Sequence, residues 1–217
     1  MGAVLADFNN DGWTDIAVSN DSLPNFLFIN KHNGTFEDVS QTSGLAAGDD
    51  GRYEAGMGID AADVDGDGWM DVYITHLDYE LNRLYHNSQN GTFADETFRS
   101  RIGNSAILLS GVACKFLDYD NDGWNDILQV NGSMLDNISL YHGEVTYEEP
   151  MLMYRNLAEA NSRRLQRNWE PIFCIRSPEG GSQQRTSTTM AISTLLRTIG
   201  VVFPRSCATT GEMRTTG

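Results

Sequence analysis

The amino-acid sequence predicts an all-β fold made of β-propeller-type blades, about three of them in this chain. The first observation behind this prediction is a repeated segment, which reads ADFNNDGWTDIAVSN from Ala6, ADVDGDGWMDVYITH from Ala62 and LDYDNDGWNDILQVN from Leu117. The copies align without gaps at an interval of about 55 residues. The second observation is that short runs rich in β-branched and aromatic residues surround each copy. Roughly four short strands per period is the content of one propeller blade.

The expected strands follow the same order in each repeat. Glycine-rich apolar runs, EAGMGIDA and LSGVACKF, precede the second and third copies. Asn33-Gly34 and Asn90-Gly91 indicate two-residue hairpins, because type I′ turns need positive φ at both central residues. The remaining strands are expected at 16–20, 72–76 and 127–131, then at 26–30 and 84–87, and finally from 35–36 and 92–93 onward.

Each repeat opens on a loop of the form D-x-[DN]-x-D-G-x-x-D, at residues 7–15, 63–71 and 118–126. Oxygen-bearing side chains occupy positions 1, 3, 5 and 9, and a glycine at position 6 permits the sharp turn that wraps a chain around an ion. Position 7 is a tryptophan whose backbone carbonyl is a further oxygen donor. The expected metal ligands are Asp7, Asn9, Asp11, Trp13, Asp15, Asp63, Asp65, Asp67, Trp69, Asp71, Asp118, Asp120, Asp122, Trp124 and Asp126.

Calcium is the ion that this ligand set predicts, with up to three ions bound. Ca²⁺ takes six to eight oxygens at about 2.3–2.6 Å, which side chains, one carbonyl and water supply. Asp and Gly also favour ordinary turns, but three copies at a fixed period favour metal binding. An EF-hand needs a helix after the loop and Glu at position 12, whereas position 12 here is Val18, Ile74 or Gln129. Loop one carries Asn9 where the others carry Asp, so we expect it to bind calcium more weakly.

The remaining aromatic and titratable residues suggest no catalytic site. We expect the three loop tryptophans to pack in the core between blades. The four histidines show no metal-ligand spacing and are expected at the surface; they are His32, His76, His86 and His142. No nucleophile elbow, zinc-protease motif or nucleotide loop occurs. The sequence therefore predicts a protein that is not an enzyme.

Charge divides the chain into two parts. Residues 1–157 hold 26 Asp and Glu against 7 Lys and Arg, whereas residues 158–217 hold 4 Glu, no Asp and 8 Arg. An acidic body argues against nucleic acid as a partner, because that surface must be basic. No apolar run of about eighteen residues occurs, so we expect no membrane span. No signal peptide is visible at the N-terminus.

At these motifs the chain resembles the FG-GAP/VCBS repeat family, whose loops bind calcium on integrin-type propeller blades. The string N-x-L-Y-x-N-x-x-G-T-F after the loop is similar to the cartilage-acidic-protein-like subgroup, which typically ends in an ASPIC/UnbV domain. Gly56-Met57-Gly58 and Gly111-Val112-Ala113 stand where the FG and GAP signatures would be. The resemblance covers residues 1–157. It implies a seven-bladed propeller that is extracellular, on the cell surface or periplasmic and acts in adhesion or recognition.

The repeat pattern ends at residue 157, although a fourth loop is due. Codon choices exist for which residues 184–194, read one frame over, encode ADFDNDGDID, and for which residues 205–217 resemble the start of an ASPIC/UnbV segment. We therefore expect residues 158–217 to be a frameshifted, poorly ordered tail. The alternative is a genuine basic tail rich in Ser and Thr.

The sequence favours a calcium-stabilised module that binds an unidentified protein or carbohydrate ligand through loops on one propeller face. An enzyme or biosynthetic accessory protein on a propeller scaffold is the alternative. It requires an acid, base or nucleophile converging on a pocket. A structural spacer without a ligand is a third interpretation that these residues leave open.

Overall fold

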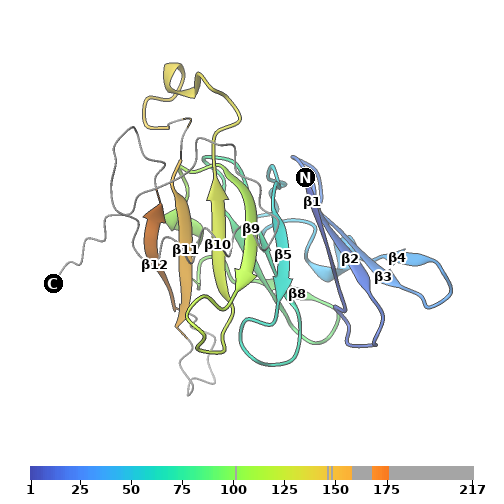
Figure 1. The fold of residues 1–217 in the computed structure, drawn as a ribbon. Helices are drawn as coiled ribbons and strands as arrows, with labels where there is room; N and C mark the ends of the chain where they lie inside the picture. The colour runs from blue at the N-terminus through green and yellow to red at the C-terminus, as the bar shows by residue number, and fades with distance from the viewer. Residues whose placement is uncertain (101, 146, 148, 158–167, 176–217) are drawn as a thin grey trace.

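Three four-stranded antiparallel sheets make up the fold (Figure 1). The structure, a computed structural model, describes residues 1–100, 102–145, 147, 149–157 and 168–175. In each sheet the strands are neighbours in chain order, which is the meander of a propeller blade. The expected all-β, blade-like fold is confirmed, and the short helices α1 (Ser40–Ser43), α2 (Ile102–Ser105) and the 3₁₀ turn Ile138–Leu140 lie in connections.

The strands of blades one and two, and the first two strands of blade three, lie close to where the sequence predicts, whereas the last two strands of blade three were not predicted. Blade one contains β1 (Gly2–Ala6), β2 (Asp15–Ser19), β3 (Phe26–Asn30) and β4 (Phe36–Asp38). Blade two contains β5 (Ile59–Ala62), β6 (Asp71–Ile74), β7 (Arg83–Asn87) and β8 (Phe93–Asp95). Blade three contains β9 (Gly111–Leu117), β10 (Asp126–Asn131), β11 (Met151–Leu157) and β12 (Asn168–Ile175).

The fourth strand of blade three lies beyond the expected division at residue 157. β12 falls within the segment expected to be a frameshifted, poorly ordered tail, and it pairs with β11 from Met151↔Ile175 to Leu157↔Asn168. This pairing supplies hydrogen-bond partners to an edge that β11 would otherwise leave open. Residues 158–167 and 176–217 lie outside the described residues, and so do the proposed frameshifted loop and the ASPIC/UnbV-like string.

The expected N-G hairpins adopt a different turn. Positive φ falls on His32 and Gly34, at 61° and 85°, and not on Asn33. The Lys31 N–H donates to the Thr35 carbonyl at 2.9 Å, so three residues form the turn instead of two. The Asn33 side chain accepts from the Thr35 N–H at 3.0 Å. This Asx-type bond offers the asparagine an alternative to the left-handed conformation that a type I′ turn demands.

Two apolar cores join the three blades. One lies between blades one and two and includes Phe8, Leu27, Val72 and Tyr85. The other lies between blades two and three and includes residues such as Tyr73, Leu84, Phe116 and Ile127. Because each core draws side chains from two sheets, a blade buries its apolar face only against its neighbour.

Arg83, at the start of β7, is the largest fully buried side chain among the residues that the structure describes, and it is paired with three carboxylates. Its guanidinium lies 2.7 Å from Glu54, 2.9 Å from Asp95 and 3.1 Å from Asp50. A side chain at Gly48 would meet this guanidinium at 2.4 Å. The ion-pair cluster therefore fixes the connection between blades one and two against β7, since breaking such a buried pair is costly.

The first strands β1, β5 and β9 lie side by side (Figure 1). Glycine permits the closest approach: a Cβ atom built on Gly58 would lie 2.6 Å from Cα of Ala113 and 2.8 Å from Oγ1 of Thr75. Such a separation is below any ordinary contact, so blades two and three depend on the missing side chain at this position.

We predict that Gly58→Ala destabilises the protein by about 1–3 kcal/mol, because the added methyl group must push β9 away from β5. Gly132→Ala is the matched control, since nothing lies within 4 Å of a Cβ there. The control should change the free energy of unfolding by no more than about 0.5 kcal/mol. Denaturant unfolding measures both, and equal values would contradict this account of blade packing.

Candidate metal centre

The three acidic loops connect the first and second strands of their blades, and all turn at the same edge of the molecule (the lower edge in Figure 1). They occupy residues 7–15, 63–71 and 118–126, as the sequence predicts. The long connection from β10 to β11 lies at the opposite edge (Figure 1).

The first aspartate of each loop holds the turn by accepting backbone N–H groups. The N–H of the position-6 glycine donates to it at 2.7 Å in loop one and at 2.9 Å in loops two and three. These glycines have φ of 84°, 86° and 90°, a conformation that favours glycine. The position-5 aspartate in turn accepts the tryptophan N–H at 2.9–3.0 Å. The glycine therefore has the role that the motif predicts for it.

The last aspartate of each loop is fully buried and joins two distant parts of its blade. In blade one, Asp15 accepts the N–H of Phe8 at 2.9 Å and that of Asn30 at 2.8 Å. Asp71 and Asp126 make the equivalent pairs of bonds. Burial raises the pKa of Asp15, against the lowering effect of its two N–H donors. These aspartates hold the loop against the third strand through hydrogen bonds that do not require a bound ion.

The remaining acidic side chains converge in loops two and three. Carboxylate oxygens of Asp63, Asp65 and Asp67 lie within 4.8 Å of one another, and the same holds for Asp118, Asp120 and Asp122. In loop one, the Asn9 side-chain amide donates to Asp11 at 2.8 Å. Three oxygens this close repel one another unless a cation lies between them, so the donor set fits a hard divalent ion.

An unsatisfied oxygen in loop three supports this fit. Oδ1 of Asp120 is buried and has no hydrogen-bond partner. Buried polar atoms in native proteins are nearly always bonded, so an exception calls for an unseen water or ion. Metal coordination to Oδ1 would supply the partner.

In blades two and three, one residue of the third strand contacts the acidic loop, and the loop motif does not indicate it. The residue directly precedes an asparagine at or near the end of the strand: it is His86 in β7 and Arg155 in β11, and Ile29 occupies the same position in β3. His86 contacts Asp71 in loop two. Arg155 lies 2.6 Å from Asp120 and 3.1 Å from Asp122 in loop three. An alignment of the three third strands shows an apolar, an imidazole and a guanidinium group at this position. That variation is the feature of the sequence from which a difference between the loops could have been predicted.

Two expectations about side chains are wrong. None of the three tryptophans is buried in the core: Trp13 is 49% exposed and stacks on His32 at 4.8 Å, and Trp69 and Trp124 are partly exposed. The reason is that position 7 lies in the loop, between the glycine turn and the start of the second strand two residues later. The Trp124 ring does lie between blades, against Gly66 of loop two. His76 and His86, expected at the surface, are 1% and 8% exposed. Burial, with a smaller contribution from Arg83, lowers the pKa of His76 to about 3.

Neighbouring blades are linked through the same asparagines. Nδ2 of Asn87 donates to the Phe8 carbonyl in loop one at 2.9 Å, and Nδ2 of Asn156 donates to the Val64 carbonyl in loop two at 2.7 Å. Loops one and two are therefore each held by their own blade and by the next one along the chain.

A pocket of about 500 Å³ lies beside the connection between blades one and two. Its lining includes the exposed rings of Tyr53, Tyr79 and Phe98 together with the carboxylates of Asp50 and Glu80. Its residues come from connections between strands and between blades, away from the three acidic loops.

An array of antiparallel blades with one acidic loop per blade defines a repeat protein of the propeller type. The FG-GAP-like repeat model matches residues 7–74 and 63–129, which is more than half of the chain. The chain belongs to the FG-GAP-like repeat family.

The chain is also similar to cartilage acidic protein 1 from three vertebrates. The identity is 32% over 110 residues for Homo sapiens, covering 50% of this chain and 16% of the relative. It is 37% over 71 residues for Xenopus tropicalis, covering 33% and 10%. For Mus musculus it is 39% over 59 residues, covering 27% and 8%. The chain thus spans less than a fifth of the length of these relatives.

Among solved structures, an Agrocybe aegerita lectin that specifically recognises non-reducing terminal N-acetylglucosamine aligns with a TM-score of 0.41. The sequence identity is 18%, over 80% of this chain and 37% of the lectin.

We predict that Asn87→Ala destabilises the protein by about 1–3 kcal/mol, because it leaves the buried Phe8 carbonyl without a donor. Asn30→Ala is the matched control, since its side chain donates only to Thr14 within its own blade and is exposed there. Urea unfolding in the presence of a chelator separates this effect from metal binding. A loss for Asn30→Ala as large as that for Asn87→Ala would contradict the role of Asn87 between blades.

Proposed function

We propose that the chain is a calcium-stabilised β-propeller module for extracellular or cell-surface binding and adhesion. The observation that carries the proposal is the convergence of three carboxylates within 4.8 Å in each of loops two and three. The backbone turn that presents them recurs in loop one. Bound Ca²⁺ would have a structural role: it would neutralise the carboxylates and hold the loop edge of each blade.

The ligand set of the proposal is the one that the motif defines. Positions 1, 3 and 5 would provide side-chain oxygens and position 7 a backbone carbonyl, with water completing the shell. The position-9 aspartates already accept two N–H groups each. Their remaining lone pairs would point to the ion, so these residues would position the loop and also serve as ligands.

The pocket between blades one and two is the candidate ligand site. Exposed aromatic rings beside carboxylates suit the stacking and hydrogen bonding by which proteins hold a sugar or a peptide side chain. Similarity to cartilage acidic protein 1 supports an extracellular location. The described part of the chain contains no helix with the length and apolar character of a membrane span.

Binding, rather than catalysis, is the proposed activity. The loop carboxylates accept backbone N–H groups and face one another, which suits an ion held in place rather than proton transfer to a substrate. The enzyme alternative would need an acid or base in contact with a bound substrate in the pocket.

Calcium should raise the melting temperature of the chelator-treated full chain. At a free concentration one hundred times the dissociation constant, one bound ion adds about 2.7 kcal/mol to the free energy of unfolding. Differential scanning calorimetry with Ca²⁺, and with Mg²⁺ at equal ionic strength as control, measures the change. The double variant Asp63→Asn, Asp118→Asn should lose most of it. Identical melting curves with and without Ca²⁺ would refute the proposal.

Loop one should be the weakest calcium site because Asn9 contributes no charge. Asn9→Asp should strengthen binding at loop one several-fold, since affinity rises with the number of carboxylates. Isothermal titration calorimetry in the Asp63→Asn, Asp118→Asn background isolates this loop. An unchanged affinity would show that ligand charge does not rank the sites.

A further inference from the structure

Loop two differs from the other loops in having a buried histidine that faces two of its carboxylates. His86 lies on β7, at the position that Ile29 occupies in β3 and Arg155 in β11. The three loops share one turn, so the chemistry of each loop depends on this position as well as on the residue at position 3, which is Asn9 in loop one and aspartate in the others.

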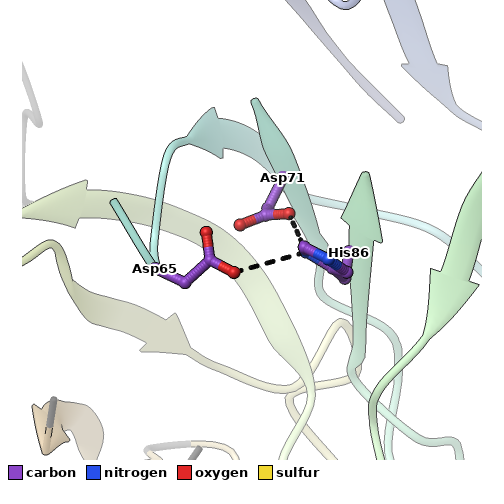
Figure 2. Close-up of side chains that lie close together, drawn as sticks. All are labelled: Asp65, Asp71 and His86. Atoms are coloured by element: carbon purple, nitrogen blue, oxygen red, sulfur yellow. Dashed lines mark hydrogen bonds and ion pairs between the residues drawn. The ribbon is translucent and has the colours of Figure 1, made fainter. Parts of the chain in front are cut away.

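The imidazole of His86 points at two aspartates of loop two, as Figure 2 shows. Its Nδ1 lies 2.8 Å from Oδ1 of Asp71 and 3.8 Å from Oδ2 of Asp65. Ligand atoms of the three side chains all fall within 4.8 Å of one another. Asp71 is fully buried and His86 is 8% exposed, so the surrounding strands hold both groups in place.

A nitrogen donor changes which cation such a cluster prefers. Ca²⁺ takes oxygen ligands, whereas imidazole suits Zn²⁺ and other first-row transition metals. Two carboxylates and one histidine are a ligand set that Zn²⁺ accepts, with a fourth position left for water. We propose that Asp65, Asp71 and His86 form a site for a transition-metal cation of the Zn²⁺ class.

The backbone of loop two prepares this site. Oδ2 of Asp71 accepts the Val64 N–H at 3.2 Å, and the Asn87 N–H donates to Oδ1 at 2.9 Å. These bonds fix the carboxylate on the side of the loop that faces β7. His86 lies on β7 next to Asn87. A metal ion could therefore take the place of the contact between Nδ1 of His86 and Asp71 without any movement of β7.

The other blades show why the site is confined to loop two. Ile29 offers no donor atom in blade one. In blade three, Arg155 already places a positive charge between Asp120 and Asp122, whose carboxylates raise the pKa of its guanidinium. At this position loop three therefore presents a guanidinium, which cannot ligate a metal, whereas loop two presents an imidazole, which can.

Asp65 belongs both to this site and to the calcium triad with Asp63 and Asp67. This inference shares one premise with the proposed function, namely that the side chains of loop two are arranged to bind a metal ion. Asp71, at position 9, would also serve both ions. Because two divalent ions would share these two carboxylates, Zn²⁺ and Ca²⁺ should compete at loop two.

Zinc titration of the tag-free, chelator-treated full chain tests the proposal. Calorimetry and native mass spectrometry should show one saturable Zn²⁺ equivalent. His86→Ile, which places the blade-one residue in blade two, should weaken it at least tenfold while leaving Ca²⁺ binding in place. Co²⁺ as a spectroscopic probe should show visible absorption bands that the same variant loses. His32→Asn is the matched control, because His32 is exposed and contacts one loop carboxylate, Asp11 at 2.8 Å.

A second measurement uses the unaltered protein, should His86→Ile fail to fold. One equivalent of Zn²⁺ should shift the imidazole nuclear magnetic resonance signals of a single histidine, and the shift should persist in His32→Asn and His142→Asn. Equal Zn²⁺ binding by wild type and a folded His86→Ile, or a shift that His32→Asn abolishes, would overturn the proposal. Zn²⁺ binding through His86 by a chain that does not bind Ca²⁺ would support this site and refute the proposed function.

Discussion

The structure depends most on the buried aspartate that ends each acidic loop. Asp15, Asp71 and Asp126 are fully buried, and each accepts one N–H from the start of its loop and one from the end of the third strand. A buried carboxylate is tolerated only when donors satisfy it, so these bonds constrain both segments at once. The loop is thus folded against the blade by hydrogen bonds that need no ion.

The three loops share a backbone but not an electrostatic environment. Positions 1 and 6 form the same turn in every copy. The equivalent position of the third strand, in contrast, is occupied by the apolar Ile29, the imidazole of His86 or the guanidinium of Arg155. In blade three the Arg155 guanidinium pairs with one oxygen of Asp120 and one of Asp122. Repetition of the fold therefore does not imply repetition of the site, because the strand that faces the loop is free to vary.

Contacts between blades come from small and polar groups as much as from the apolar cores. Gly58 lets β5 approach β9, and Asn87 and Asn156 hold the loops of the preceding blades. Arg83 holds the connection between blades one and two through its ion pairs with Asp50 and Glu54. It also pairs with Asp95 of β8. An acidic chain with formal net charge −15 thus uses one of its few basic side chains inside the fold, where the desolvation cost is offset by the pairing.

The sequence by itself determined the repeat, the strands and the positions of the acidic loops. These features are local: strand propensity, the glycine with positive φ and the spacing of the aspartates act within a few residues. The tertiary structure decided the rest, since it depends on contacts between distant segments. It buried His76 and His86, left Trp13 exposed and paired β12 with β11. It also placed His86 beside Asp71, which lies in another strand, and no spacing within the motif could indicate that contact.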